Sequence, residues 1–277
     1  MKVTGKTKIT GIFGYPVEHT LSPAMHNAAF EALGLNYCYI PFSVHPDQLS
    51  AAVEAIRALN LRGVNITIPH KERVMPMLDT IDDEASFIGA INTIVSSGGK
   101  LKGYNTDGRG FMRSLSESGI DVKDRDVLII GAGGAARAIG FYLARKAKAL
   151  YIYGRTPERG ERLALDLKKV SENVSTIPDI SSVDRFHVII NATPLGLKDG
   201  DTMPLDASVL QREHIVCDLI YGDTRFLREA SKRGCTTLNG LGMLLWQGVF
   251  AFELWTGRQP DVEIMRKALK NTISRFH

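Results

Sequence analysis

The sequence predicts an α/β fold made of two domains. Segments typical of strands alternate with segments typical of helices along the whole length, which favours mostly parallel sheets. The pattern breaks near Asp107 and a second series of strands and helices then begins. The length of 277 residues suits one large domain or two modest ones. We therefore expect two α/β domains, with the cleft between them as the default ligand site.

Composition favours an ordinary globular protein, since 44% of the residues are hydrophobic and 23% are charged. This balance excludes a disordered chain, a collagen-like repeat and a coiled coil. A net charge of +4 could favour anionic ligands, but a nucleic-acid surface needs clustered basic residues, so no nucleic-acid partner is expected. Three distant cysteines indicate neither a disulfide framework nor a zinc site, so no metal is expected.

The predicted location is the cytoplasm, because isolated cysteines are typical of a reducing compartment. The first eight residues lack the apolar segment of a signal peptide. The longest apolar stretch, 243–255, is interrupted by Gln247 and Glu253 and falls short of the ~20 apolar residues that a bilayer span needs. We therefore expect a soluble protein without a membrane partner.

The first series holds five predicted strands and two helices. Ser22 suits the N-cap of the first helix and Pro23 suits its first position, while Gly34 suits its C-terminal stop. Apolar and polar side chains alternate cleanly over 64–69, which predicts a strand, and Lys71 lies just past its end. The predicted strands are 9–14, 37–42, 64–69, 91–95 and 101–104, and the second helix is 46–60.

The second series starts with the apolar strand 127–130, after a helix at about 109–118 and a polar connector. Two helices close the chain. Its later strands are predicted at 150–153, 187–191, 216–220 and 236–238, and the closing helices at about 243–256 and 261–275.

A glycine-rich loop of the G-x-G-x-x-A pattern follows strand 127–130 and opens a helix. Gly131 permits the tight turn, Gly133 lets the backbone approach a pyrophosphate, and Ala136 keeps the helix close to the strand. The N-terminus of the helix offers N–H groups to the anion. The alternative is a glycine-rich turn without a ligand, but the strand–loop–helix context favours a dinucleotide.

The end of the next strand, 150–153, distinguishes NADP(H) from NAD(H). An NAD site usually places an acidic residue there for the ribose 2′-hydroxyl, and this strand tip has none. Arg155 and Arg159 could straddle a 2′-phosphate, with Thr156 donating a hydrogen bond. The alternative is two solvated surface arginines. The pattern predicts NADP(H).

Polar groups stand where strands or loops of the first half end. Taken singly, each has a structural explanation, as a helix cap, a solvated lysine or an Asx turn. Together they suggest a small polyhydroxylated or carboxylated ligand, and a lysine with an aspartate can move a proton. These groups are Thr20, Ser22, Thr67, Lys71, Asn92, Asp107 and Gln247.

Seven groups of short motifs, in the same order, resemble the shikimate dehydrogenase family over nearly the whole chain. They are 14–17 with 21–27, then 65–71, 88–93, 103–108, 131–137, 191–196 and 239–244. The resemblance implies NADPH-dependent reduction of 3-dehydroshikimate to shikimate, a step towards aromatic amino acids. It also implies a substrate-binding catalytic domain (1–107), a Rossmann-type NADP-binding domain (108–242) and C-terminal helices (243–277) that return to the first domain. A monomer and a homodimer both stay open.

The resemblance also implies roles for individual residues. Lys71 is expected to be the catalytic acid/base, with Asp107 beside it. The substrate would be held by Thr20, Ser22, Thr67, Asn92, Asp107 and Gln247, with Tyr221 near its carboxylate. The cofactor would lie on Gly131, Ala132, Gly133, Gly134 and Ala135, with Arg155, Thr156 and Arg159 at the adenosine phosphate, Leu219 and Gly240 at the nicotinamide end, and Asp83 near that end.

Two residues depart from the family pattern. Thr20 stands where members usually have Ser, so the hydroxyl survives with an extra methyl group. Gly154 stands where Asn is usual, which removes a polar contact to the adenosine phosphate and weakens the case for NADP(H). Two other functions stay open: a quinate/shikimate dehydrogenase with relaxed use of NAD and NADP, and a non-catalytic NADP-binding regulatory protein, which would be free to lose Lys71 and Asp107.

Overall fold

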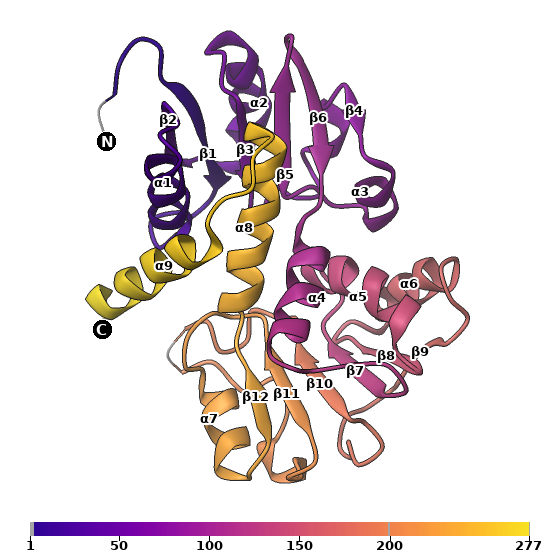
Figure 1. Ribbon diagram of the computed structural model, residues 1–277. Helices are drawn as coiled ribbons and strands as arrows, with labels where there is room; N and C mark the ends of the chain where they lie inside the picture. Colours follow the sequence, from indigo (N-terminus) through magenta and orange to yellow (C-terminus); the bar gives the residue numbers. More distant parts are fainter. Residues whose placement is uncertain (1–2, 199, 277) are drawn as a thin grey trace. The chain divides into compact units, whose positions relative to one another are not determined.

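The computed structural model describes residues 3–198 and 200–276 (Figure 1). The chain divides into two compact units, each with a six-stranded sheet. Unit 1 combines residues 1–106 with residues 245–277, and unit 2 is residues 107–244. Unit 1 is therefore assembled from two segments that are far apart in the sequence.

The sheet of unit 1 is mixed, with strand order β2-β1-β3-β5-β6-β4. Strand β1 pairs in parallel with both β2 and β3, whereas β5 runs antiparallel to β3 and to β6, and β4 pairs in parallel with β6. The strands are β1 (Lys8–Gly14), β2 (Tyr37–Ser43), β3 (Gly63–Ile66), β4 (Thr80–Ile81), β5 (Thr93–Ser97) and β6 (Lys100–Tyr104).

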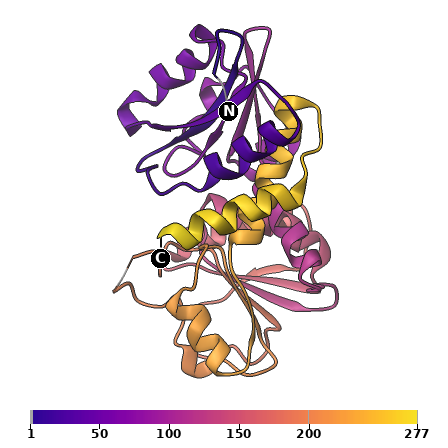
Figure 2. The same cartoon turned by 60° about the vertical axis from the view of Figure 1, so that its left-hand side comes forward.

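The helices of unit 1 come from both ends of the chain. Helix α1 (Ser22–Ala32) lies beside α9 (Val262–Phe276), as Figures 1 and 2 both show. Helix α8 (Leu241–Thr256) also belongs to this unit from Leu245 onward. A 3₁₀ turn (Pro46–Gln48) leads into α2 (Leu49–Ala58), whose buried residues Leu49, Val53 and Ile56 recur at helical spacing and join the core of the unit.

The indole of Trp255, near the end of α8, is fully buried against the sheet of unit 1. Its Nε1 donates to the carbonyl oxygen of Ile94 on β5 at 2.9 Å. A Cβ at Gly63 on β3 would lie 2.4 Å from Nε1, so the absence of a side chain there lets the indole approach. Arg62 donates to the carbonyl oxygen of Trp255 at 2.8 Å. These contacts fix α8 on the sheet.

The sheet of unit 2 is wholly parallel, with strand order β12-β11-β10-β7-β8-β9. This is the order of a Rossmann-type sheet, and it reverses between β7 and β10. The strands are β7 (Asp126–Ile130), β8 (Ala149–Tyr153), β9 (Val174–Thr176), β10 (Val188–Asn191), β11 (Ile215–Asp218) and β12 (Thr236–Leu238), and the helices are α4 (Asp107–Glu117), α5 (Gly134–Lys146), α6 (Pro157–Lys168) and α7 (Arg225–Lys232).

Two of the predictions at the level of elements were wrong in detail. Ser22 is not an N-cap: α1 begins at this residue, Leu21 takes the N-cap position, and no side chain caps the helix. The strand predicted over 64–69 ends at Ile66, because the N–H of His70 donates to the carbonyl oxygen of Thr67 at 2.9 Å and closes a turn. All four residues of β3 are buried, so the strand has no solvent-facing side.

Several short elements were absent from the prediction, among them β4, β9, α7 and the helix α3 (Asp83–Ile88). Two or three residues of a strand are too few to show periodicity. Within the described part of the chain, no helix combines the length and apolarity that crossing a membrane requires. No group of three or more His, Cys, Asp or Glu suited to a metal ion occurs in the same residues.

Candidate active site

Three buried polar residues of unit 1, Asn92, Thr106 and Gln247, form one hydrogen-bonded cluster. The side chain of Asn92 accepts from the N–H of Thr106 at 2.8 Å and donates to the Thr106 hydroxyl at 2.9 Å. The same amide group of Asn92 donates to Oε1 of Gln247 at 3.4 Å, and the Thr106 hydroxyl donates to the Gln247 carbonyl at 3.0 Å. The structure thus brings together two predicted substrate residues that lie 155 positions apart.

Lys71 is tied to this cluster through its backbone. It lies in the turn after β3, and its carbonyl oxygen accepts from the N–H of Ile91 at 2.8 Å. Ile91 directly precedes Asn92. Because the Lys71 side chain is only partly buried, it has access to solvent while its backbone is held next to the cluster.

Thr20 and Ser22, the predicted hydroxyl pair, also lie together. The hydroxyl of Thr20 accepts from the N–H of Ser22 at 3.3 Å, and Ser22 is buried. On the neighbouring strand end, Thr67 packs against Gly14: a Cβ at Gly14 would lie 2.4 Å from Cγ2 of Thr67. Any side chain at Gly14 would therefore displace the predicted substrate residue Thr67.

Asp107 is the first residue of α4 and the first residue of unit 2. Its side chain is buried, and it directly follows Thr106, whose N–H bonds Asn92. An acidic side chain in the first turn of a helix is favoured by the helix dipole. The cluster therefore holds Thr106, the last residue of this segment of unit 1.

The glycine loop of unit 2 has the geometry of an anion cradle. It follows β7, at the point where the strand order reverses, which is where ligands bind in open α/β sheets. Gly131 has a φ of 121°, and a Cβ there would lie 2.8 Å from the carbonyl oxygen of Ala192. Gly133 caps α5 without a side chain, and a Cβ there would meet open space. The first N–H groups of α5 are therefore approachable by a pyrophosphate.

The predicted adenosine-phosphate residues are exposed after β8. Arg155 and Thr156 lie in the connection to α6, Arg159 lies in its first turn, and Thr156 caps the helix without a side-chain hydrogen bond. Neighbouring cations and a hydroxyl near a helix N-terminus suit a phosphate. A Cβ at Gly154 would lie 3.2 Å from the carbonyl oxygen of Thr156, so an Asn there would need small adjustments.

Leu219 and Gly240, predicted at the nicotinamide end, are in contact. A Cβ at Gly240 would lie 2.1 Å from the carbonyl oxygen of Leu219, and the N–H of Gly240 donates to the carbonyl of Ile220 at 3.0 Å. Tyr221, two residues after Leu219, is 41% exposed. Asp83 belongs to the other unit: it is exposed at the start of α3 in unit 1, whereas the other predicted cofactor residues belong to unit 2.

Asp218, the last residue of β11, connects the end of β10 to the segment between β11 and α7. The sequence interpretation did not identify it. One carboxylate oxygen accepts from Asn191 at 2.9 Å and from the N–H of Ile220 at 3.1 Å, and the other accepts from Thr224 at 2.8 Å. Burial raises the pKa of Asp218, although these three donors act in the opposite direction. An acidic residue inside an otherwise apolar strand was the signal that could have identified it.

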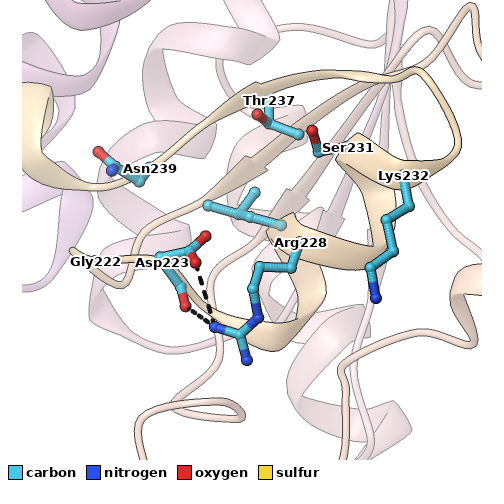
Figure 3. A pocket seen from close by; sticks show the side chains of 8 residues that line it. Gly222, Asp223, Arg228, Ser231, Lys232, Thr237 and Asn239 are labelled. Atoms are coloured by element: carbon cyan, nitrogen blue, oxygen red, sulfur yellow. Dashed lines mark hydrogen bonds and ion pairs between the residues drawn. The ribbon is translucent and has the colours of Figure 1, made fainter.

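A pocket of about 370 Å³ lies between α7 and β12, and none of the predicted site residues lines it (Figure 3). Its cations are already paired: Arg228 donates to the carbonyl and the carboxylate of Asp223, and Lys232 bonds Glu229 at 2.8 Å. We therefore do not assign it to the substrate. Its lining is Gly222, Asp223, Leu227, Arg228, Ser231, Lys232, Thr237 and Asn239.

A wholly parallel sheet in this strand order, with a glycine loop at the point of reversal, defines a protein with a Rossmann-type dinucleotide-binding domain. Three family models narrow that class. The shikimate dehydrogenase substrate binding domain matches residues 12–94, the shikimate/quinate 5-dehydrogenase model matches residues 114–196, and the shikimate 5′-dehydrogenase C-terminal domain matches residues 240–270. The chain belongs to the shikimate dehydrogenase family.

Individual relatives match this chain over almost its full length. The chain is 48% identical to a shikimate dehydrogenase (NADP⁺) of Desulforamulus reducens, with 99% of this chain and 98% of the relative covered. A crystal structure of a shikimate dehydrogenase in complex with NADP⁺ matches with a TM-score of 0.92 at 42% identity, covering 98% of both chains. The enzyme of Thermus thermophilus in complex with NADP(H) and shikimate matches with a TM-score of 0.88 at 38% identity, covering 96% of this chain and 99% of that one.

Proposed function

We propose that this protein catalyses the reversible, NADP(H)-dependent reduction of 3-dehydroshikimate to shikimate, in the biosynthesis of aromatic amino acids. The buried cluster of Asn92, Thr106 and Gln247, next to the backbone of Lys71, is the observation that carries the proposal. It supplies the amide and hydroxyl groups that a polyhydroxylated ring needs, and it lies in the unit that matches the substrate binding domain of the family.

The cofactor fits the chain at the glycine loop. Gly131, Ala132, Gly133, Gly134 and Ala135 would hold the pyrophosphate, because Gly133 leaves open space at the N-terminus of α5. NADPH supplies the hydride when it is bound. Arg155, Thr156 and Arg159 would bind the 2′-phosphate, Leu219 and Gly240 would line the nicotinamide end, and Asp83 is proposed near that end.

Lys71 is proposed to handle the proton. In the direction of reduction, negative charge develops on the oxygen of the substrate carbonyl, and the ammonium group of Lys71 stabilises that charge and gives up a proton. In the direction of oxidation, the neutral amine takes the proton back. The carboxylate of Asp107 is proposed to orient the ammonium group and to accept from a substrate hydroxyl.

The remaining proposed contacts to the substrate come from two kinds of side chain, hydroxyls and amides. Thr20 and Ser22 offer neighbouring hydroxyls, and Thr67 adds a third from the end of β3. Asn92 and Gln247 offer amides, each able to donate and accept. Tyr221 is proposed to contact the substrate carboxylate.

The direct test is turnover by the purified protein. We expect the absorbance of the reduced nicotinamide to rise with shikimate and NADP⁺, and kcat/KM to be at least ~10-fold higher with NADP⁺ than with NAD⁺, because two arginines can pair with the extra phosphate. Higher kcat/KM with quinate and NAD⁺ would favour a quinate/shikimate dehydrogenase. No turnover with either substrate would favour a regulatory NADP-binding protein.

A Lys71→Ala variant tests the proposed acid/base. We expect kcat to fall by about 10²–10⁴-fold, the usual contribution of general acid–base catalysis, with the KM for shikimate changed little. Lys100→Ala removes an exposed lysine of the same unit and should leave kcat unchanged. Near-normal kcat in Lys71→Ala would remove Lys71 from the mechanism.

The cytoplasm is proposed as the location, on the ground that all three cysteines are free and buried. We propose that the protein acts as a monomer or a homodimer with no partner beyond its small-molecule ligands.

A further inference from the structure

Tyr39 on β2 is joined by a buried hydrogen bond to Asn65 on β3. The phenol is 2% exposed, and its hydroxyl donates to Oδ1 of Asn65 at 2.8 Å. Since its one proton is directed to Asn65, the phenol determines which end of the Asn65 amide is the acceptor. Tyr39 therefore fixes the orientation of the Asn65 side chain.

Asn65 continues the chain of hydrogen bonds towards Asn92. With Oδ1 accepting from Tyr39, the amide group donates to the carbonyl oxygen of Asn92 at 3.0 Å and to the hydroxyl of Thr93 at 3.0 Å. The Thr93 hydroxyl in turn donates to Oδ1 of Asn92 at 2.9 Å. The side-chain orientation of Asn92 is thus set by Thr93 on one side and by Thr106 on the other.

The path runs from Tyr39 to Gln247 through Asn65, Thr93, Asn92 and Thr106, and each member is at most 8% exposed. Asn92 and Gln247 are proposed substrate residues. Tyr39, Asn65 and Thr93 have no such proposed role, yet their hydrogen bonds lead to Asn92. Buried polar groups are strongly held when every donor and acceptor is satisfied, because losing one bond leaves a desolvated partner.

The position of the Tyr39 hydroxyl is itself fixed by packing. The ring stacks on His26 with centroids 4.4 Å apart and an angle of 10° between the planes. Asn27 clamps the backbone of Tyr39: its side chain donates to the Tyr39 carbonyl at 3.0 Å and accepts from the Tyr39 N–H at 2.8 Å. The hydroxyl therefore has one available position, next to Asn65.

We propose that Tyr39, Asn65 and Thr93 are positioning residues that orient Asn92 and Gln247 for substrate before it arrives. The proposal rests on the proposed function. Pre-oriented groups lose less conformational entropy when a ligand binds, so the network should act on the affinity for shikimate and not on the affinity for the cofactor. It should also leave the chemistry at Lys71 nearly unchanged.

Tyr39→Phe is the sharpest variant, because it removes one oxygen and keeps the stacked ring. We expect the Kd of the full-length protein for shikimate, measured by calorimetry, to rise by about threefold to tenfold, as loss of one buried hydrogen bond does. The Kd for NADP⁺ should stay within about twofold, and kcat should change less than the KM for shikimate.

Tyr37→Phe is the matched control. Tyr37 lies on the same strand, is also buried, and bonds the carbonyl oxygen of Trp255 at 3.5 Å, outside the network. We expect it to leave the Kd for shikimate unchanged. An equal rise in Tyr37→Phe and Tyr39→Phe would assign the effect to general loosening of β2 and would overturn the proposal.

A double-mutant cycle with Asn92→Ala tests whether Tyr39 acts through Asn92. If it does, Tyr39→Phe combined with Asn92→Ala should bind shikimate no more than about twofold more weakly than Asn92→Ala alone. If the two substitutions raise the Kd for shikimate independently, so that the factors multiply in the double variant, the proposal is overturned. An unchanged Kd in Tyr39→Phe would also overturn it.

Thr93→Val is a second, nearly isosteric variant that serves if Tyr39→Phe fails to fold. It removes the donor to Oδ1 of Asn92 and should raise the Kd for shikimate in the same selective way; an unchanged Kd would again overturn the proposal. If the unmodified protein binds NADP⁺ but neither binds nor oxidises shikimate, the proposed function fails, whatever the variants do.

Discussion

His26 on α1 is a fully buried histidine enclosed by aromatic rings. It lies between Tyr39 and Phe252, with ring centroids 4.4 and 6.4 Å away, and neither ring nitrogen has a hydrogen-bond partner among the described residues. Burial lowers its pKa from 6.5 to about 3. The native protein therefore keeps this imidazole neutral at a pH where the unfolded chain protonates it.

The sign of the resulting pH dependence follows from proton uptake. Between pH 6.5 and pH 3 the unfolded state binds a proton at His26 that the native state does not, so the free energy of unfolding falls as the pH falls. His26→Phe removes this contribution. Between pH 7 and pH 4.5, the free energy of unfolding measured with urea should fall by about 2.5 kcal/mol more in the unmodified protein than in the variant.

His19→Phe provides the comparison for that measurement. His19 is exposed, so His19→Phe makes the same exchange of side chains and leaves the buried imidazole of His26 in place. If His26→Phe and the unmodified protein lose the same free energy between the two pH values, the imidazole is not neutral in the native state and the burial argument fails.

At the scale of residues, the sequence could predict which side chains carry suitable functional groups, but not which residues they bond in the fold. Lys71, Asn92 and Gln247 were recognisable from motifs and from the resemblance. The bond between Asn92 and Gln247 was not, because it joins positions 155 apart and depends on tertiary packing. Tyr39 was predicted only as part of an apolar strand, since nothing local indicates where its hydroxyl points. Assignment of roles to these site residues stays a prediction.

At the scale of elements, the glycine loop shows two different uses of glycine. Gly131 is needed by the fold: its φ is 121°, and a Cβ would lie 2.8 Å from a backbone oxygen. Gly133 is not needed by the fold, because its φ is −89° and a Cβ would have no neighbour within 4 Å. The absence of a side chain at Gly133 agrees with its proposed role beside the pyrophosphate of the cofactor.

The two alanine variants should separate stability from cofactor binding. Gly131→Ala should lower the free energy of unfolding by about 1–3 kcal/mol, because a strained backbone meets a steric clash. Gly133→Ala should change it by less than about 1 kcal/mol, yet raise the Kd for NADP⁺ at least ~10-fold by blocking the approach of the pyrophosphate. Thermal unfolding and calorimetry check both. Unchanged NADP⁺ affinity in Gly133→Ala would contradict this assignment of the loop.

Long elements were predictable from their pattern, and short ones were not. The helix after the glycine loop and the strand before it were recognised because apolar residues recur at the right spacing over several turns or pairs. Strand β4 has two residues and one hydrogen-bonded neighbour, β6, so its existence is decided by the sheet and not by its own sequence. The end of β3 was misjudged because the turn that closes it depends on a backbone bond at His70.

At the scale of the whole molecule, unit 1 depends on a segment from the far end of the chain. Phe30 on α1 stacks on Phe252 at 4.8 Å, and Trp255 bonds β5. Burying each such aromatic side chain contributes roughly 1.5–3 kcal/mol. The periodicity of 243–256 predicted a helix there, but only the resemblance implied where it packs, because an apolar face does not specify its partner.

This arrangement predicts an asymmetry between the two units. Residues 107–244 are continuous and contain a complete sheet with its own core, so this fragment alone should unfold cooperatively and bind NADP⁺, without oxidising shikimate. Residues 1–106 alone should not unfold cooperatively, because Met25, His26 and Phe30 lose the cover of α8 and α9. Circular dichroism with urea, and calorimetry with NADP⁺, provide the measurements.

The decisive control joins residues 1–106 to residues 245–277 through a flexible linker. Because this chimera restores the buried contacts of Trp255 and Phe252, it should regain a cooperative transition that 1–106 lacks. Trp255→Ala in the chimera should remove that transition again, since it deletes both the indole and its bond to Ile94. A cooperative transition in residues 1–106 without the C-terminal segment would show that α8 and α9 are dispensable for unit 1, and stability would then have to come from the sheet and its preceding helices alone.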